Sequence, residues 1–350
     1  MFDKHILFLN GNTYGGSMKK ILIYIIIVSC MLYIPLSAAP LPEYKNYQYI
    51  KPSEILGEDG TLILSNSPET VKEKGILYCE QLLGKGRLVF HHVNATHEND
   101  QRLLIVVKNL TKSEQRFEVH QEGYSMPHYH YLEAGNRLLK DYYGCMTSKV
   151  YFLKPDEQMV LYDSAPYEWK QQMVLSGMLD VYATNQVEIL FAVIGKNDTL
   201  DCLSELKALD IDLAPRGTFT SLTKYQYIIL PKKQNAYFLI EDEKTDWLKG
   251  VDRLTGKCAI NYGNYGVLYK VQLIAQEDTT VFVCPRGGIF QGIIRWENGE
   301  MIQVARKHFF KTIKERINIG VIKKNEVRTL EYILPNGSAA PILLGFDINV

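Results

Sequence analysis

Residues 86–93 read Gly-Arg-Leu-Val-Phe-His-His-Val, and a second apolar run, Leu-Leu-Ile-Val-Val, follows at residues 103–107. Short runs of this kind, rich in β-branched and aromatic residues and bounded by turn residues, are typical of strands in a sandwich or barrel. Runs of the same kind recur at residues 150–153, 160–162, 187–193, 225–230, 237–240, 266–273 and 280–284. The sequence therefore predicts an all-β protein.

The apolar runs fall into two groups along the chain. Residues 61–200 and residues 216–350 both show the strand pattern, whereas residues 201–215 have a weak helical period that Pro215 ends. Residues 39–60 are a polar lead-in. Because a domain commonly takes roughly 100–200 residues, we expect two tandem antiparallel β-sandwich domains, at 61–200 and 216–350, with a short helical linker at 201–215.

The N-terminal region reads as an export signal. Two lysines follow Met18, residues 21–34 are almost wholly apolar, and small residues lead to Ala39. This order of charge, apolar run and small residues is the pattern of a secretory signal peptide. The apolar run of about 14 residues is short for a spanning helix, which needs roughly 20. We expect residues 18–38 to be the signal peptide, with cleavage after Ala38.

Residues 1–17 do not fit in front of such a signal, because they form a polar leader. Gly15 and Gly16 can be encoded by a ribosome-binding sequence just before the codon of Met18. We therefore expect translation to start at Met18 and residues 1–17 to be a mis-annotated leader.

The mature protein is expected to be extracellular or bound to the cell envelope. Two alternatives would attach it to the membrane. The signal could remain as an uncleaved anchor, or Cys30, which follows the lipobox-like Ile-Val-Ser at residues 27–29, could be lipidated.

Charge and cysteine content limit the other partners. Lysine plus arginine and aspartate plus glutamate both number 39, so charge offers no argument for binding nucleic acid. We expect a cell-wall polysaccharide or another envelope protein as partner, and no cofactor. Five cysteines remain after cleavage, an odd and widely spaced set that is not a disulfide framework; one or two bridges and free thiols both remain open for Cys79, Cys145, Cys202, Cys258 and Cys284.

Several segments together resemble known exported proteins of unassigned function. They are residues 65–69, 75–77, 86–94, 215–219, 263–267 and 285–288. The opening segments are similar to an exported cyanobacterial family. Residues 86–94 are similar to a region of secreted Gram-positive proteins that often carry copper-amine-oxidase-like stalk domains. The resemblance spans roughly residues 60–348 and implies an uncharacterised, exported, β-rich bacterial family. This chain lacks the stalk repeat, which leaves any cell-wall attachment through that repeat in doubt.

Histidines are the first candidate site residues. Most of the eight histidines fall between His91 and His130. A His-x-His pair on a strand, such as His128 and His130, places both rings on one face. A metal site would need a further ligand, such as His91 or His120. A metal-dependent enzyme is therefore one alternative, and a set of surface histidines is the other.

Aromatic rings are the second candidate, because flat rings stack on sugar faces. The rings in question belong to Trp247, Tyr262, Tyr265 and Trp296. Core packing is the alternative role, above all for Trp296, which precedes the hairpin signal Asn298-Gly299. If the rings line one exposed face, the protein binds carbohydrate.

No nucleophile elbow of the form Gly-x-Ser-x-Gly occurs, and the acidic pairs lie in turn-like stretches. The sequence therefore predicts a structural or interaction protein without catalytic activity. Carbohydrate binding and metal-dependent catalysis are the alternatives.

Overall fold

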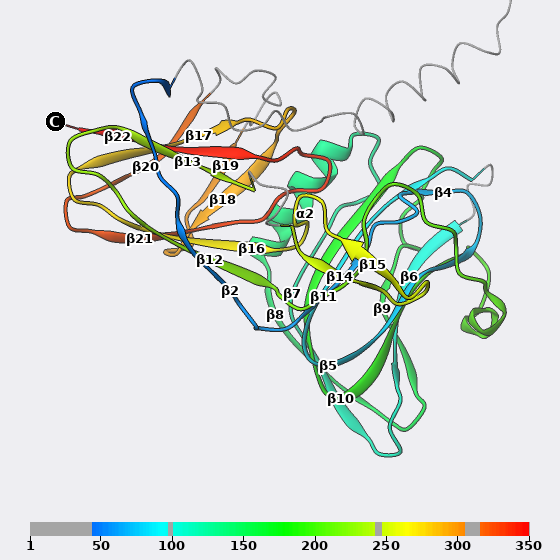
Figure 1. Cartoon of the computed structure of the whole chain (residues 1–350). Coiled ribbons are helices and arrows are strands. Elements are labelled where there is room, and N and C mark those ends of the chain that lie inside the picture. The colour runs from blue at the N-terminus through cyan, green and yellow to red at the C-terminus, as the bar shows by residue number, and fades with distance from the viewer. Residues whose placement is uncertain (1–43, 97–100, 242–246, 305–315, 350) are drawn as a thin grey trace, which may run out of the picture. The chain divides into compact units, whose positions relative to one another are not determined.

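Strands make up most of the chain in the computed structural model, which confirms the predicted all-β class (Figure 1). The structure describes residues 44–96, 101–241, 247–304 and 316–349. The predicted leader at 1–17 and signal peptide at 18–38 lie outside these residues. Within them, no helix is long and apolar enough to cross a membrane.

The runs that predicted the fold form the centre of an 11-stranded sheet. Residues 86–93 belong to β5 (Gly75–Asn94), which pairs antiparallel with β10 (Val174–Gly195). The other side of β10 pairs with β7 (Gln115–Tyr124) in its first half and with β6 (Gln101–Asn109) in its second half. The remaining strands of this sheet are β3 (Thr61–Ser65), β4 (Thr70–Val71), β8 (Met146–Leu153), β9 (Gln158–Asp163), β11 (Arg216–Phe219), β14 (Lys249–Asp252) and β15 (Lys257–Ile260).

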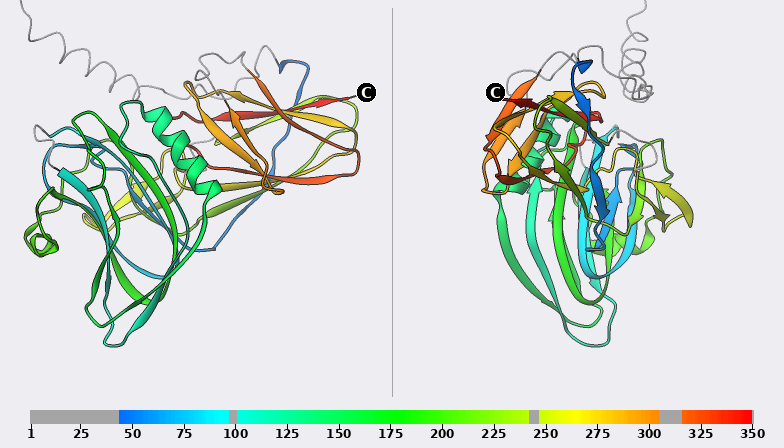
Figure 2. Two further views of the ribbon diagram at one scale, coloured as in Figure 1. Left: turned by 180° about the vertical axis from the view of Figure 1, so that it is seen from behind. Right: turned by 60° about the vertical axis from the view of Figure 1, so that its left-hand side comes forward.

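Two smaller sheets enclose a shared hydrophobic core (Figure 2). The five-stranded sheet contains β1 (Gln48–Tyr49), β13 (Ala236–Ile240), β22 (Ile342–Ile348), β17 (Thr279–Pro285) and β20 (Ile317–Ile322). The six-stranded sheet contains β19 (Met301–Val304), β18 (Gly292–Trp296), β21 (Val327–Tyr332), β16 (Leu268–Ile274), β12 (Thr223–Ile229) and β2 (Ser53–Leu56). Phe238 and Phe346 from the first sheet and Val271 and Leu330 from the second pack in that core.

Strand β3 connects the sandwich with the large sheet. Its residues alternate between two faces, as strand geometry requires. Leu62 and Leu64 join the core of the sandwich, while Ile63 joins the separate core of the large sheet. Helix α2 (Tyr131–Gly144) contacts β7, β10 and β18, and it adds Leu138 to the sandwich core. The large sheet is therefore covered on both faces around β3.

Strands on both sides of the predicted linker share one sheet. The linker begins with a 3₁₀ helix, η2 (Leu200–Glu205), and β11 follows it and pairs with β3. Strands β14 and β15 extend the same sheet beyond β11. The polar lead-in also contributes, because β1 pairs with β13 and β2 pairs with β12. Residues 201–215 therefore do not mark the border between sheets. The pairing of β11 with β3 joins residues far apart in the chain, and the local sequence does not reveal it.

No disulfide joins any two of the five cysteines that the sequence left open. Cys145 and Cys258 are exposed, and Cys284 is buried in the five-stranded sheet. The described fold is therefore held by packing, hydrogen bonds and ion pairs.

Candidate functional site

Trp296, one of the four predicted ligand-binding rings, is a core residue. Its side chain is fully buried, and its Nε1 donates a hydrogen bond to the carbonyl oxygen of Ile319 at 2.7 Å. The guanidinium carbon of Arg328 lies 4.0 Å from the centre of the ring. The prediction that Trp296 faces a ligand is therefore wrong, because the second sheet of the sandwich covers the ring.

The other three predicted rings lie nearer the surface. Trp247 and Tyr262 have ring centres 5.1 Å apart and planes at 85°. Tyr262 is about half exposed, whereas Tyr265 is partly buried and packs against the sandwich core. An edge-to-face pair does not offer one flat surface for a sugar ring. Ligand binding at Trp247, Tyr262 and Tyr265 stays a prediction.

The four predicted histidine ligands are not assembled into a metal site. His120 lies on β7, half exposed and 3.6 Å from Glu118. The rings of His128 and His130 are 5.4 Å apart in the segment before α2. His91 is buried in β5. In the described ranges, no group of three or more His, Cys, Asp and Glu side chains is placed to hold a metal ion.

His91 instead contacts a serine. Its Nδ1 lies 2.6 Å from Oγ of Ser176 on the neighbouring strand β10. A serine beside a histidine is the contact that activates a nucleophile. Ser176 is fully buried, however, and its backbone N–H donates to Oγ of Ser125. The hydroxyl is therefore a hydrogen-bonding group of the interior and is not presented to a substrate.

Glu69 lies beside Asp212, and the carbonyl oxygen of the preceding Pro68 contacts His92. Its backbone N–H donates to Oδ2 of Asp212 at 2.7 Å. Burial, and then the charge of Asp212, raise the pKa of Glu69 to about 7. Because the unfolded chain releases this proton near pH 4.5, the stability of the protein should fall as the pH rises from 4.5 to 7.

We expect Glu69→Gln to remove this loss, since the amide carries no charge to bury. The variant should exceed the parent in free energy of unfolding by about 1–3 kcal/mol at pH 8. At pH 4 the two proteins should be nearly equal. Urea unfolding followed by tryptophan fluorescence at both pH values measures the difference. An equal difference at the two pH values would show that Glu69 does not titrate in this way.

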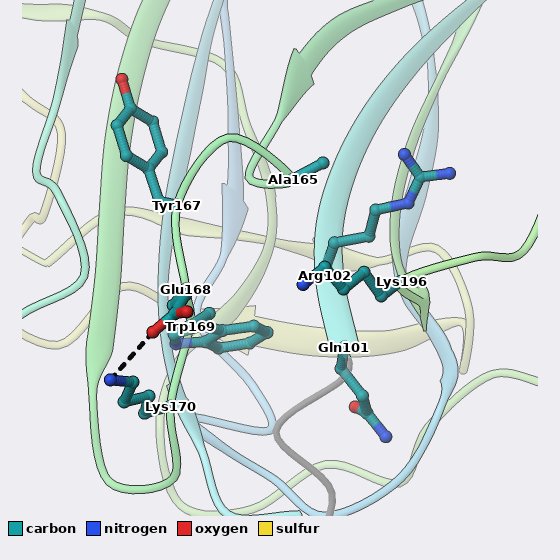
Figure 3. Close-up of a pocket in the computed structure, with 8 residues that line it drawn as sticks. All are labelled: Gln101, Arg102, Ala165, Tyr167, Glu168, Trp169, Lys170 and Lys196. Atoms are coloured by element: carbon teal, nitrogen blue, oxygen red, sulfur yellow. Dashed lines mark ion pairs between the residues drawn. The ribbon is translucent and has the colours of Figure 1, made fainter.

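A pocket of about 310 Å³ lies beside the loop between β9 and β10 (Figure 3). In this view Glu168 and Lys170 lie on one side of Trp169, and Arg102 and Lys196 lie on the other. The pocket is lined by Gln101, Arg102, Ala165, Tyr167, Glu168, Trp169, Lys170 and Lys196. Three separate segments of the chain thus contribute to it.

Side-chain hydrogen bonds hold the loop in place. Ser164 Oγ accepts from the backbone N–H of Leu103 at 2.8 Å. Asn94 Nδ2 donates to the carbonyl oxygen of Trp169 at 2.6 Å, and Trp169 Nε1 donates to the carbonyl oxygen of Met173 at 2.8 Å. The Trp169 ring is buried in the core of the large sheet. The pocket wall is therefore anchored at both ends, as a preformed site requires.

Two residues that line the pocket keep unpartnered polar atoms. Gln101 is only 7% exposed, and its Oε1 has no hydrogen-bond partner among the described residues. Arg102 contacts Asp163 at 2.7 Å and the carbonyl oxygen of Asp198 at 2.6 Å, yet its Nε has no partner there either. A buried polar atom without a partner costs about 1–3 kcal/mol. The terminal amide torsion of Gln101 is soft, so rotation can exchange the positions of its oxygen and its nitrogen.

Charges in the pocket are partly compensated. Lys170 Nζ lies 2.8 Å from Oε2 of Glu168, and this contact lowers the pKa of Glu168. Arg102 is paired with Asp163. Lys196 forms no ion pair within the part of the chain that the structure describes, but its charge also lowers the pKa of Glu168. The positive charge of Lys196 therefore has no carboxylate in direct contact among the described residues.

A second pocket, of about 460 Å³, lies between the end of α2, β7 and β19. It is lined by Glu122, Gly123, Tyr124, Lys140, Asp141, Gly144, Cys145 and Met301. Among the described residues, none of these side chains holds a buried polar atom that lacks a partner. The pocket beside Trp169 is therefore the stronger candidate site.

Sequence reasoning missed this pocket because its parts are far apart in the chain. The register of β10 and β6 places Gly195 opposite Gln101, which brings Lys196 to the start of β6. Strand β9 pairs with β6 on the other side and brings the loop that carries Trp169. No local motif marks these residues.

Comparison with known proteins does not assign the chain to a family. No family model matches it, and no curated protein matches it. Among solved structures, the CUB1-EGF-CUB2 domains of rat MASP-1 match with 8% identity and a TM-score of 0.22, over 79% of this chain and 98% of that chain. McoA multicopper oxidase from Aquifex aeolicus matches with 11% identity and a TM-score of 0.14, over 76% and 50%. Scores this low support neither a shared fold nor a shared activity.

Proposed function

We propose that this chain is an exported, non-catalytic binding protein of the cell envelope, and that it binds a small saccharide or one unit of a cell-wall polysaccharide. The export part of the proposal is supported by the signal-like residues 18–38. The observation that carries the binding part is the pocket beside Trp169, whose lining includes the unpartnered amide oxygen of Gln101.

The chemistry of the pocket suits a sugar better than an apolar ligand. Sugar hydroxyl groups both donate and accept hydrogen bonds, so they can satisfy the amide of Gln101. Tyr167, which is 41% exposed, offers a ring at the pocket for the C–H face of a sugar. The volume of about 310 Å³ is at the low end for small-molecule sites, which span roughly 300–1,000 Å³. A ligand of one or two rings is therefore expected.

A glycan array with the purified protein, followed by calorimetry with the best ligand, tests this function. Gln101→Leu should weaken binding about tenfold, because it removes one hydrogen-bonding group worth about 1.4 kcal/mol. Gln234→Leu is the matched control, since Gln234 is exposed between β12 and β13 and does not line the pocket. The glycan should be recovered chemically unchanged.

Three outcomes would contradict the proposal. The array could retain no glycan, Gln101→Leu could bind as well as the parent, or the glycan could be cleaved. The last outcome would overturn the non-catalytic assignment alone.

A further inference from the structure

Lys196 gives the pocket beside Trp169 a charge preference. It directly follows Gly195, the last residue of β10, whose partner in the β6 ladder is Gln101. The lysine thus lies at the end of the strand pair that also carries Gln101, and it lines the same pocket. Its side chain is exposed, so its ammonium group can contact a ligand and remain partly hydrated.

The other two cations of the pocket already have carboxylate partners. Arg102 Nη1 contacts Asp163 at 2.7 Å, and Lys170 Nζ contacts Glu168 at 2.8 Å. Lys196 has no such partner among the described residues. A bound ligand with one negative charge would complete the pairing, whereas a cationic ligand would meet an uncompensated like charge.

We propose that the pocket takes an acidic saccharide with a single carboxylate, that is, a uronic acid or a polysaccharide unit containing one. This inference rests on the proposed saccharide-binding function. The carboxylate lies against Lys196, and the hydroxyl groups lie toward Gln101. A lysine suits this role because its ammonium is a point charge on a flexible stem with three donors.

Calorimetric titration with D-glucuronate and D-glucose tests the inference. Glucuronate should bind up to about fivefold more tightly at low ionic strength, since an exposed ion pair contributes up to about 1 kcal/mol. Added salt should reduce this preference. Lys196→Gln should abolish it, Lys196→Arg should keep most of it, and Lys232→Gln, an exposed lysine outside the pocket, should leave it unchanged.

Each other outcome has a defined meaning. Equal binding of glucose and glucuronate would overturn the charge preference and leave saccharide binding intact. A preference that survives Lys196→Gln would overturn the role of Lys196. Acetate that binds as tightly as glucuronate would show a simple anion site and overturn the saccharide assignment. Binding of neither sugar nor any glycan would overturn the proposed function itself.

Discussion

Asp252→Asn is expected to lower the free energy of unfolding by about 3–5 kcal/mol, because it leaves the buried guanidinium of Arg216 without a counter-charge. Nη2 of Arg216 lies 2.9 Å from Oδ2 of Asp252, and both side chains are almost fully buried. Nη1 of the same arginine donates to the carbonyl oxygens of Leu77 and Leu209 at 3.0 and 3.1 Å. The pair therefore ties β11 and β14 to β5 and to the segment after η2.

Denaturation in guanidinium chloride measures this loss. The matched control is Asp278→Asn, which breaks the exposed pair between Asp278 and Lys323. Exposed pairs contribute at most about 1 kcal/mol, so the control should change little. Replacing both partners, as in Arg216→Met with Asp252→Asn, should cost less than the sum of the two single changes. Similar losses for Asp252→Asn and Asp278→Asn would contradict a structural role for the buried pair.

Acid is expected to destabilise the protein through two buried histidines. Burial lowers the pKa of His91 to about 3 and the pKa of His92 to about 4. The unfolded chain takes up both protons near pH 6.5, whereas the folded chain does not, so stability is lost as the pH falls from 6.5 to 4. Each histidine should contribute a loss of about 3 kcal/mol at pH 4.

Urea unfolding between pH 7 and pH 4 tests this prediction. Each variant is compared with the parent at every pH, because the titration of Glu69 changes the stability of both proteins in the opposite direction. His91→Gln and His92→Gln should lower stability at pH 7, since each loses its contact with a serine. Each should also flatten the acid dependence. His120→Gln, at a half-exposed position on β7, is the control for removal of a surface histidine. An acid loss that persists in both buried-site variants would rule out these histidines as its cause.

These two histidines show what a strand pattern reveals and what it does not. Residues 86–93 predict a strand, and strand geometry puts His91 and His92 on opposite faces. The burial of both rings depends on the residues that pack against each face of the strand. His92 contacts Ser65 of β3 and the carbonyl oxygen of Pro68, while His91 contacts Ser176 of β10. These contacting residues belong to segments that are distant in the sequence.

Trp296 shows the same limit: the sequence predicts the hairpin correctly but not the direction in which this side chain points. The Asn298-Gly299 signal predicts a hairpin, and β18 and β19 pair antiparallel around it, with Gly299 at a φ of 88°. The side chain of Trp296 could have pointed to solvent or to the core. Contacts with the carbonyl oxygen of Ile319 and the guanidinium of Arg328 hold the ring in the core, and both residues lie more than twenty positions away in sequence.

The sequence by itself determined that the protein is built mainly of strands, because the alternation of side chains along a strand is a local property. It also predicts export from residues 18–38. Only the tertiary structure decided which strands share a sheet, which rings are buried and where the pocket lies. Strand pairing joins residues such as Gly195 and Gln101, or Arg216 and Ser65, across long stretches of chain. The free energy of those contacts depends on burial in the assembled fold, which no short stretch of sequence contains.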